Sequence, residues 1–555
     1  MRVLGLSAYF HDSAAALVVD GQLVAFAQEE RLSRRKNDAA LPMRAASFCL
    51  RQAGLSPQDL DAVVWYEKPL LKLERVLLSS LRTFPRSVTT FRRAMVSMIG
   101  DKMWVKSHLV SRLGIAGDKV LFSAHHSSHA ASAFFCSPFE EAAILTVDGV
   151  GEWATTSSFL GSGSEIKALR EIHFPHSLGL LYSVFTAFLG FEVNEGEYKV
   201  MGLAAWGEPR YREQVDRVFR QEADGSFALD MGYFCFHREP DRSWESSFEQ
   251  LFGAPRAPGD PIEQRHKDLA ASVQAALEDA LLALARQVHR DTGASKLCLA
   301  GGVALNSVAV GRLLRDGPFD DVFVQPAAGD AGGALGAALL ASGGPRAVLE
   351  HAAYGADVDP DHVRGFLRDG GISFTEVSDV AAAVAERLVQ GQIVGWMQGR
   401  FELGPRALGQ RSILADPRDA ANKQRLNDKV KFREDFRPFA PSVLAAASAE
   451  LFELPGGGAW TRRFMTSVVP ARDQRVAAAL HVDNTARVQE VYPETQPLYA
   501  RLLQEFGARS GVPCVVNTSF NLAGEPMVAS VSDAWATFLR CDIDALAVGP
   551  FLVTR

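Results

Sequence analysis

The fold is indicated first by residues 2–27, which read RVLGLSAYFHDSAAALVVDGQLVAFA. Apolar runs at residues 3–6, 14–19 and 22–27 predict three strands, with a polar turn around His11 and Asp12 between the first two. Asp20-Gly21 separates the last two runs and is a hairpin signal. The stretch therefore predicts a strand that is followed by a β-hairpin.

Related units recur further along the chain. Residues 143–147 form an apolar run that enters the turn Asp148-Gly149-Val150-Gly151, and residues 155–160 form the next run. A third unit has an apolar run at 296–300, followed by Gly301-Gly302-Val303-Ala304-Leu305-Asn306. Strands that end in acidic or glycine turns, repeated within one chain, predict a duplicated α/β domain with a nucleotide between its lobes.

The glycine turns are candidate phosphate-binding elements. Backbone N–H groups at such turns and at helix N-termini can approach a phosphate closely, because glycine has no side chain to hold it away. Ordinary tight turns remain the alternative explanation for each. The predicted nucleotide-binding residues are Gly149, Gly151, Gly301, Gly302, Val303, Asn306, Gly329 and Asp330.

A domain boundary is predicted where helical periodicity breaks down. Residues 268–290 and 332–341 have helix-compatible patterns, whereas residues 342–360 concentrate Gly, Pro and Asp. We therefore expect one domain over residues 1–350 and another over residues 360–555. The second has its own strand signals at 392–396 and 513–516.

Composition limits the class of protein. The 555 residues are 47% hydrophobic and 22% charged, the usual balance of a globular chain, and the net charge of −7 argues against a nucleic-acid partner. No uncharged apolar run is long enough for a membrane-spanning helix, so no membrane partner is expected. Six scattered cysteines fit reduced thiols in a cytoplasmic enzyme and exclude a zinc ribbon.

A metal site is predicted from the run His125-His126-Ser127-Ser128-His129. His125 and His129 are four residues apart, so a helix would place both imidazoles on one face. Asp148 and Asp330, each in a turn, could add carboxylates. Such a ligand set with open positions suits iron(II), manganese or zinc. The alternative is that the histidine spacing arose by chance.

Two segments are rich in basic residues. From residue 400 to 437 there are ten Lys/Arg against six Asp/Glu, including Arg406, Lys431 and Arg433. On an extended segment Lys431 and Arg433 would share a face, and Ser519 and Asn521 repeat that alternation with neutral groups. This pattern predicts a pocket for a small phosphorylated molecule, with a solvated basic face as the alternative.

The other basic segment spans residues 68–112, which contain ten Lys/Arg and two acids, Glu74 and Asp101. An amphipathic helical insertion with a solvated face is one interpretation. A docking surface for an anionic or protein-carried acceptor is the other.

Long motifs in a fixed order resemble the NodU/CmcH-type O-carbamoyltransferases, the family of tobramycin, cephamycin and nodulation-factor carbamoyltransferases. They include HDSAAA at 11–16, EERLSRRK at 29–36, HHSSHAASAF at 125–134, GEYKVMGLA at 196–204, AGGVALN at 300–306, GPRALGQRSILADPR at 404–418 and NTSFN at 517–521. The resemblance extends over essentially the whole chain.

The resemblance implies a fold and a set of site residues. The N-terminal domain is expected to have the actin-like ATPase fold, similar to the threonylcarbamoylation protein TsaD, and the C-terminal domain a YrdC-like fold. Family metal ligands correspond to His125, His129, Asp148 and Asp330, with iron(II) as the expected ion. The carbamoyl phosphate site corresponds to Arg406, Lys431, Arg433, Arg487, Ser519 and Asn521, and the catalytic, acceptor-side residues to His11 and Lys36.

The resemblance also implies the reaction. Carbamoyl phosphate and ATP, with Mg²⁺, would yield carbamoyl-adenylate, whose carbamoyl group passes to a hydroxyl of a small molecule such as an antibiotic, polyketide or sugar. His11 is the candidate base, because imidazole titrates near neutrality, with a turn-capping histidine beside Asp12 as the alternative. A small-molecule kinase, a non-catalytic ATP-binding partner and a tRNA threonylcarbamoylation protein are the rival functions. The sequence does not identify the acceptor, and a homodimer is left open.

Overall fold

The computed structural model describes all 555 residues, and these divide into two compact units. The first unit comprises Met1–Val24 and Ala39–Val348, and the second comprises Ala25–Asp38 and Leu349–Arg555. The sequence-based division, residues 1–350 and 360–555, did not anticipate that the early segment belongs with the second unit. This segment is held there by polar contacts: the buried Arg31 donates to the carbonyl of Gly404 (2.7 Å).

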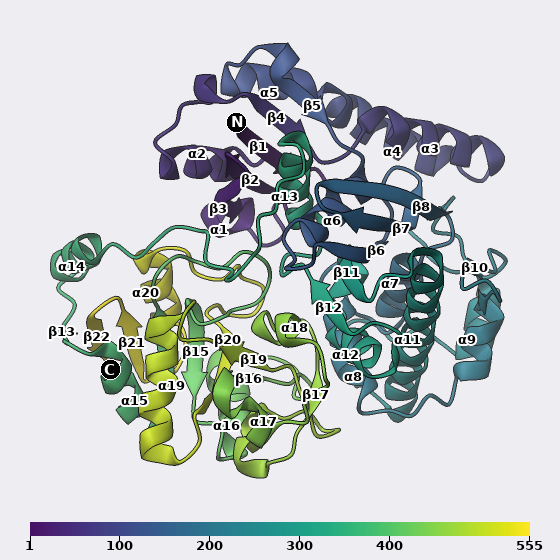
Figure 1. The fold of residues 1–555 in the computed structure, drawn as a ribbon. Coiled ribbons are helices and arrows are strands. Elements are labelled where there is room, and N and C mark those ends of the chain that lie inside the picture. The colour runs from purple at the N-terminus through teal and green to yellow at the C-terminus, as the bar shows by residue number, and fades with distance from the viewer. The chain divides into compact units, whose positions relative to one another are not determined.

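The first sheet contains the strands predicted at the start of the chain (Figure 1). Its order is β3-β2-β1-β4-β5, in which β1 and β2 are antiparallel while β1, β4 and β5 are parallel. The strands are β1 (Arg2–Ser7), β2 (Ala14–Val19), β3 (Gln22–Gln28), β4 (Ala62–Trp65) and β5 (Val120–Phe122).

The second sheet repeats this arrangement. Its order is β8-β7-β6-β11-β12, with antiparallel pairs among β6, β7 and β8 and parallel pairs among β6, β11 and β12. The strands are β6 (Glu141–Val147), β7 (Ala154–Ser162), β8 (Glu165–His173), β11 (Lys296–Ala300) and β12 (Asp321–Val324). Two sheets with the same strand order and directions confirm the predicted duplicated domain of the actin-like ATPase fold.

Two helices pack closely at the centre of the first unit, α6 (His125–Phe134) and α13 (Asp330–Ala341). A Cβ atom at Gly336 of α13 would lie 1.8 Å from the carbonyl oxygen of Ser128, so only glycine permits this approach to α6. On the other side of α13, a Cβ atom at Gly5 of β1 would lie 1.8 Å from the carbonyl oxygen of Ala334. The small residues of α13 therefore hold its N-terminus next to α6.

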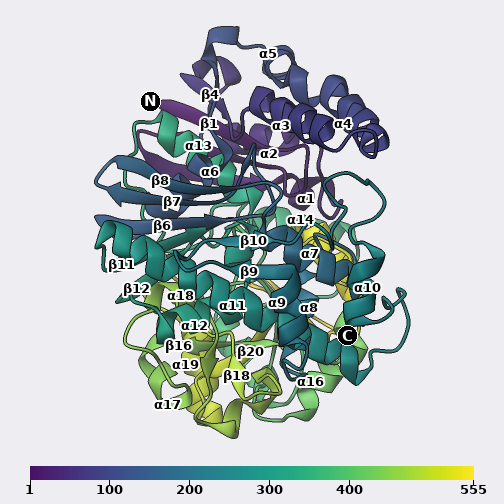
Figure 2. The ribbon, with the colours of Figure 1, turned by 90° about the vertical axis from the view of Figure 1, so that its right-hand side faces the viewer.

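Helix α2 (Met43–Gln52) packs against the first sheet and α11 (Gln264–Thr292) against the second (Figure 2). The predicted helix over residues 268–290 is confirmed as part of α11, which ends at Gly293 in the left-handed conformation (φ 67°). The other helices are α3 (Pro69–Arg82), α4 (Val88–Gly100), α5 (Val105–Leu113), α7 (Leu178–Phe188), α8 (Glu197–Ala204), α9 (Arg212–Val218), α10 (Ser246–Phe252) and α12 (Ser307–Asp316), and β9 (Phe219–Gln221) pairs with β10 (Phe227–Leu229).

The basic segment at residues 68–112 is helical, as one interpretation of the sequence predicted, because it contains α3, α4 and α5. No helix in the chain combines the length and the apolar character that crossing a bilayer requires. All six cysteines are buried and unpaired.

The second unit contains a mixed eight-stranded sheet of order β13-β22-β21-β14-β15-β20-β16-β19. The strands predicted at 392–396 and 513–516 correspond to β14 and β20. The strands are β13 (Thr375–Glu376), β14 (Val394–Met397), β15 (Arg411–Ala415), β16 (Ala440–Leu444), β19 (Gln489–Val491), β20 (Cys514–Ser519), β21 (Ala545–Val548) and β22 (Phe551–Thr554), with a separate pair β17 (Val469–Pro470) and β18 (Thr485–Ala486).

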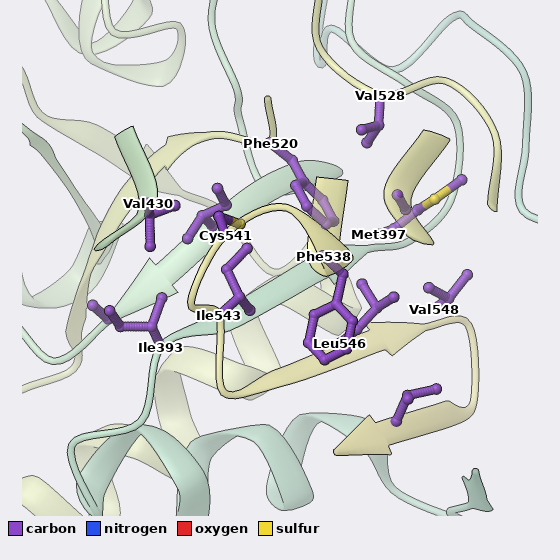
Figure 3. Packing of buried hydrophobic residues seen from close by; sticks show 14 of the residues in the cluster. Ile393, Met397, Val430, Phe520, Val528, Phe538, Cys541, Ile543, Leu546 and Val548 are labelled. Atoms are coloured by element: carbon purple, nitrogen blue, oxygen red, sulfur yellow. The ribbon is translucent and has the colours of Figure 1, made fainter. Parts of the chain in front are cut away.

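Both faces of this sheet are buried. Alternate residues of β15 enter different clusters: Ile413 joins the cluster in Figure 3, which includes Phe538 of α20 (Val531–Leu539), whereas Leu414 joins the one that includes Tyr499 of α19 (Pro497–Ser510). This alternation is the two-residue period of a strand. The remaining helices are α1 (Glu29–Ser33), α14 (Pro360–Asp369), α15 (Val380–Val389), α16 (Ala421–Leu426), α17 (Ser448–Leu451) and α18 (Ala459–Arg463).

The extended conformation predicted around Lys431 and Arg433 is wrong. Asn427–Lys431 forms a π-helical turn that continues α16, and Phe432 has the left-handed conformation (φ 48°), with its N–H donating to the carbonyl of Asn427 (2.6 Å). The alternation of basic and aromatic residues thus arises at a helix end, where the left-handed residue reverses the chain.

Candidate functional site

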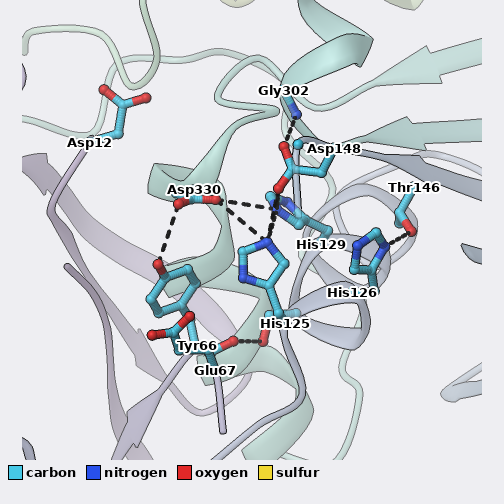
Figure 4. Close-up of polar contacts among 12 residues, drawn as sticks. Asp12, Tyr66, Glu67, His125, His126, His129, Thr146, Asp148, Gly302 and Asp330 are labelled. Atoms are coloured by element: carbon cyan, nitrogen blue, oxygen red, sulfur yellow. Dashed lines mark hydrogen bonds and ion pairs between the residues drawn. The ribbon is translucent and has the colours of Figure 1, made fainter. Parts of the chain in front are cut away.

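The four predicted metal ligands meet in the first unit (Figure 4). Their ligand atoms all lie within 4.8 Å of one another. The two histidine Nε2 atoms are 3.1 Å apart. Asp148 Oδ2 lies 3.0 Å from His125 Nε2, and Asp330 Oδ1 lies 3.5 Å from His129 Nε2.

Each ligand is positioned by a separate feature of the fold. His125 and His129 occupy successive turns of α6, as the spacing predicted, and Asp148 directly follows β6. Asp330 is the first residue of α13, the helix whose small residues allow it to lie against α6. Three of the four side chains are at most 5% exposed, and that of Asp148 is 15% exposed.

The charges of the cluster perturb one another strongly. Burial lowers the pKa of His129, but the hydrogen bonds and charges of Asp148 and Asp330 outweigh it and raise that pKa to about 9. Burial likewise raises the pKa of Asp148, yet its contacts with the two histidines hold it well below its usual range. Two buried imidazoles whose Nε2 atoms converge with two carboxylates form a donor set that fits a divalent transition metal.

Three further groups orient the ligands. Glu152 is buried and its carboxylate accepts from the backbone N–H of His125 (2.9 Å) and from that of Lys68 (2.8 Å). The Tyr66 hydroxyl donates to Asp330 Oδ2 (3.3 Å), and the Gly302 N–H donates to Asp148 Oδ1 (2.9 Å). Sequence reasoning missed Glu152 and Tyr66 as site residues. The one sequence feature that could have indicated Glu152 is its position directly after the turn Asp148-Gly149-Val150-Gly151.

The glycine turns serve different purposes. Gly301 has a φ of +93°, and a Cβ atom there would lie 2.2 Å from the carbonyl oxygen of Val147, so this glycine permits backbone packing. A Cβ atom at Gly151 would lie 2.9 Å from the His125 ring, whereas one at Gly149 would contact nothing. Gly329 precedes α13, and a Cβ atom there would lie 3.5 Å from Asp12 Oδ2.

The Gly301 turn continues through Val303 in a 3₁₀ turn (Gly302–Leu305) to Asn306. The Asn306 side chain caps α12 by accepting from the Ala309 N–H (3.1 Å) and also bonds to Gln274. Its amide is therefore occupied by structural contacts. Gly151, Gly302, Gly329 and Asp330 are the predicted nucleotide-binding residues whose contacts lie at the metal cluster or at Asp12.

The two predicted catalytic residues belong to different units. His11 Nδ1 lies 3.2 Å from Asp12 Oδ2 in the first unit. Burial lowers the pKa of His11, but Asp12 and the carboxylates of the metal cluster outweigh it and raise that pKa to about 9. The expectation that this imidazole titrates near neutrality is therefore wrong for the metal-free protein. Lys36 belongs to the second unit, where its Nζ pairs with Glu30 (2.9 Å).

In the second unit, Lys431 organises part of the predicted phosphate pocket. Its buried Nζ donates to the carbonyl and the side-chain oxygen of Asn521 (both 3.0 Å) and to the hydroxyl of Ser519 (3.3 Å). Ser519 in turn donates to Asn521 Oδ1 (2.6 Å). The structure thus brings the predicted Lys-x-Arg and Ser-x-Asn pairs together at Lys431, although by a helical turn rather than an extended segment.

Guanidinium groups gather beside Lys431. Burial and the charges of Arg406, Arg433 and Arg437 hold the pKa of Arg487 well below its usual range. The Arg433 guanidinium lies 4.3 Å above the Phe439 ring and donates to Asn427 Oδ1 (3.2 Å). The Arg487 Nε is also buried without a hydrogen-bond partner. An anion bound here would accept a hydrogen bond from this Nε and offset the like charges, so the cluster is suited to binding an anion.

Comparison with known proteins identifies the family. The family model described as Carbamoyltransferase N-terminus matches residues 2–339, and the one described as Carbamoyltransferase C-terminus matches residues 385–555. An uncharacterized protein of Synechocystis sp. is 44% identical, over 100% of this chain and 97% of its own length. Nodulation protein NolNO of Sinorhizobium fredii is 41% identical, over 99% of this chain and 79% of its own length. Nodulation protein NolO of Bradyrhizobium diazoefficiens is 43% identical, over 78% of each chain.

Solved structures resemble the chain only distantly. Component A of (R)-2-hydroxyglutaryl-CoA dehydratase from Acidaminococcus fermentans is 16% identical with a TM-score of 0.33, over 62% of this chain and 98% of that one. The ROK hexokinase of Thermus thermophilus is 18% identical with a TM-score of 0.28, over 61% of this chain and 98% of that one. The fold assignment rests on the sheet topology, and the family rests on the two matched regions: the chain belongs to the carbamoyltransferase family and is an enzyme of that family.

Proposed function

We propose that the protein is an ATP-dependent O-carbamoyltransferase that uses carbamoyl phosphate, forms carbamoyl-adenylate and carbamoylates a hydroxyl of a small molecule. The observation that carries the proposal is the buried cluster of His125, His129, Asp148 and Asp330. A second site rich in arginine, in the other unit, supports it. A family enzyme with one cation-binding and one anion-binding site has the groups that two half-reactions on phosphorylated substrates require.

The first half-reaction is assigned to the second unit. The guanidinium groups of Arg406, Arg433 and Arg487 hold the phosphate of carbamoyl phosphate, and Lys431 fixes Ser519 and Asn521 beside it. Water cleaves the carbamoyl–phosphate bond and releases phosphate and carbamate. A carbamate oxygen then attacks the α-phosphorus of ATP, pyrophosphate leaves, and the mixed anhydride carbamoyl-adenylate results.

The second half-reaction is assigned to the first unit. An iron(II)-like ion held by the four ligands, with Mg²⁺ accompanying ATP, would supply positive charge toward the nucleotide phosphates. The N-terminus of α13, which follows Gly329, would face the same anion. The acceptor oxygen attacks the carbamoyl carbon, and AMP leaves with the bonding electrons.

His11 is assigned the role of the base that takes the proton from the acceptor hydroxyl. In its neutral form the imidazole can accept this proton, and its raised pKa must first be offset. Asp12 contributes most to the raised pKa, and a cation among Asp148 and Asp330 would offset the smaller contribution of those two carboxylates. Lys36, ion-paired with Glu30, is assigned to the acceptor side.

The products test the proposal. With carbamoyl phosphate, ATP and a hydroxyl acceptor, the proposal expects AMP and pyrophosphate, whereas ADP would indicate a kinase and no turnover would indicate a non-catalytic ATP-binding protein. His129→Ala should lose the bound metal and the carbamoyl transfer. His173→Ala, which changes an exposed histidine paired with Glu171, is the matched control. Retention of both properties by His129→Ala would refute the site assignment.

A further inference from the structure

Exposed apolar side chains concentrate on one part of the first unit, the helical hairpin of α3 and α4 with the turn Thr83–Ser87 between them, here called the α3–α4 hairpin. Nine of the chain's nineteen large exposed apolar residues lie between positions 70 and 104. They are Leu70, Leu71, Leu78, Leu81, Phe84, Val88, Val96, Ile99 and Trp104. Single exposed apolar residues are ordinary, but a concentration of this kind marks an interaction surface.

The exposed residues form a stripe on each helix. At about 100° per residue, Leu70, Leu78 and Leu81 lie within about 80° of arc on α3. By the same geometry Val88, Val96 and Ile99 lie within about 80° on α4. Leu81 at the end of α3, Phe84 in the turn and Val96 on α4 are each 71% exposed, and Leu70 at the start of α3 is 69% exposed.

Basic side chains lie among these apolar residues. Arg82 and Arg86 flank Phe84, and Arg92 falls inside the α4 stripe; all three are exposed. Across residues 68–112 the ratio is ten basic to two acidic residues, whereas the whole chain carries 58 basic and 65 acidic residues. The hairpin is therefore a cationic, apolar surface on an otherwise acidic protein.

The opposite side of the hairpin is anchored. The guanidinium of the buried Arg75 lies 5.2 Å above the Phe174 ring, and the Thr90 hydroxyl donates to the carbonyl of Arg238 (2.5 Å). Arg93 donates to Asp241 (2.5 Å). Both helices thus have an inner face with its own partners, so the outer apolar stripes are not the result of an unpacked hairpin.

We propose that the α3–α4 hairpin docks this protein on an anionic lipid surface. Interleaved Leu, Phe, Val and Arg on helices that lie parallel to a surface are typical of interfacial membrane binding, in which apolar side chains enter the headgroup region and cations meet lipid phosphates. The absence of a spanning helix does not bear on this mode of attachment.

Charge and shape favour a lipid surface over other occupants. A second copy would present the same cations, so two hairpins would repel each other. The exposed apolar side chains extend along both helices and the turn, and a fluid bilayer accommodates such an extended surface without needing a complementary groove. Figures 1 and 2 both show α3 and α4 side by side at the edge of the first unit.

The test uses the full-length protein and vesicle flotation. Phosphatidylcholine vesicles are compared with vesicles in which phosphatidylglycerol replaces about a third of the lipid, since only the latter carry a negative surface potential. Binding is expected to the anionic vesicles alone and to weaken at high salt, which screens the attraction.

Two variants separate the charged and apolar contributions. Arg82→Gln/Arg86→Gln/Arg92→Gln should weaken partitioning on the order of 100-fold, the equivalent of about 1 kcal/mol per cation. Leu81→Ser/Phe84→Ser should weaken it by more than about tenfold, because two apolar side chains no longer enter the interface. The matched controls change exposed residues elsewhere: Arg217→Gln/Arg315→Gln/Arg368→Gln removes the same charge, and Leu539→Ser removes an apolar side chain that is 59% exposed.

The outcomes are decisive either way. The proposal holds if only the hairpin variants lose vesicle binding while all variants keep the wild-type circular dichroism spectrum and carbamoyl transfer. It is overturned if wild-type protein ignores anionic vesicles, if the controls are equally impaired, or if the hairpin variants convert a dimer to a monomer and leave vesicle binding unchanged. Vesicle binding is measured without substrates, so a failure here is distinct from a failure of the proposed reaction.

Discussion

The carboxylate of Glu152 accepts the backbone N–H of His125 through both oxygens, at 2.9 and 3.1 Å, at the first residue of α6. A negative charge at a helix N-terminus satisfies an N–H group that has no partner within the helix and favours the helix dipole. Because α6 carries both histidines of the proposed metal site, this carboxylate fixes the end of the helix on which those histidines lie.

Replacing Glu152 should therefore loosen the metal cluster. Glu152→Ala leaves the His125 N–H buried without a partner, and we expect a loss of about 1–3 kcal/mol in the free energy of unfolding. Metal affinity should fall by about 10–100-fold, the usual effect of removing a group that orients a ligand. Metal titration and chemical denaturation measure the two effects. Glu165→Ala on exposed β8 is the control, and equal metal affinity in both variants would contradict the assignment.

The raised pKa of His11 predicts a pH dependence of stability in the metal-free protein. The folded pKa of about 9 exceeds the ordinary value of 6.5, so the folded state binds more protons in this interval. The stabilisation is complete below about pH 6.5 and is lost as pH rises through about 9. His129 titrates in the same range, so His11→Asn should flatten this decline without abolishing it.

Urea denaturation of the metal-stripped protein between pH 6 and pH 9.5 measures the decline. His173→Asn, at an exposed position, is the control and should follow the wild type. An unchanged slope in His11→Asn would show that His11 does not hold its extra proton in the folded state.

Replacing Arg487 should impair the use of carbamoyl phosphate but not the transfer of the carbamoyl group from carbamoyl-adenylate. Arg487→Ala removes one guanidinium from the cation cluster, and losing a charge-assisted contact of about 1.5–3 kcal/mol should raise the KM for carbamoyl phosphate about 10–100-fold. Transfer from supplied carbamoyl-adenylate should be little changed, because the proposal assigns that step to groups of the first unit. Steady-state kinetics with each donor measure this difference. Arg472→Ala, exposed in the same unit, is the control, and equal damage with both donors would place both steps in one site.

Arg31 should stabilise the second unit. Its side chain is 1% exposed, lies 3.9 Å from Glu30 and donates to the carbonyl of Gly404. Arg31→Ala removes one partner of a buried ion pair, so we expect a loss on the order of 3 kcal/mol in the free energy of unfolding. Calorimetry should show a lower Tm for the transition of the second unit. Arg35→Ala, at an exposed position, should leave that Tm unchanged.

The features that sequence could predict depend on local periodicity. The histidine spacing on α6 and the apolar runs of the repeated units each lie within a few residues of sequence, so strand, helix and turn rules suffice to place them. Asp148 and Asp330 could be named as candidate carboxylate ligands because each lies in a turn near the predicted strands.

The features that sequence missed depend on contacts between distant residues. Tyr66 bonds to Asp330 across 264 positions, and no local pattern marks it. The π-helical turn before Phe432 overrode an alternation that reads as a strand, because that turn continues α16. The shift in the pKa of His11 required knowing which carboxylates surround it.

The placement of Ala25–Asp38 in the second unit has a consequence for synthesis. Arg34 donates to the carbonyls of Pro526 and Met527, which follow it by 492 and 493 positions. The ribosome therefore makes this segment long before it makes these partners. The usual order, in which an N-terminal domain folds while the rest is still being translated, is therefore not open to the whole of this chain. The second unit can therefore close only after Pro526 and Met527 have left the ribosome.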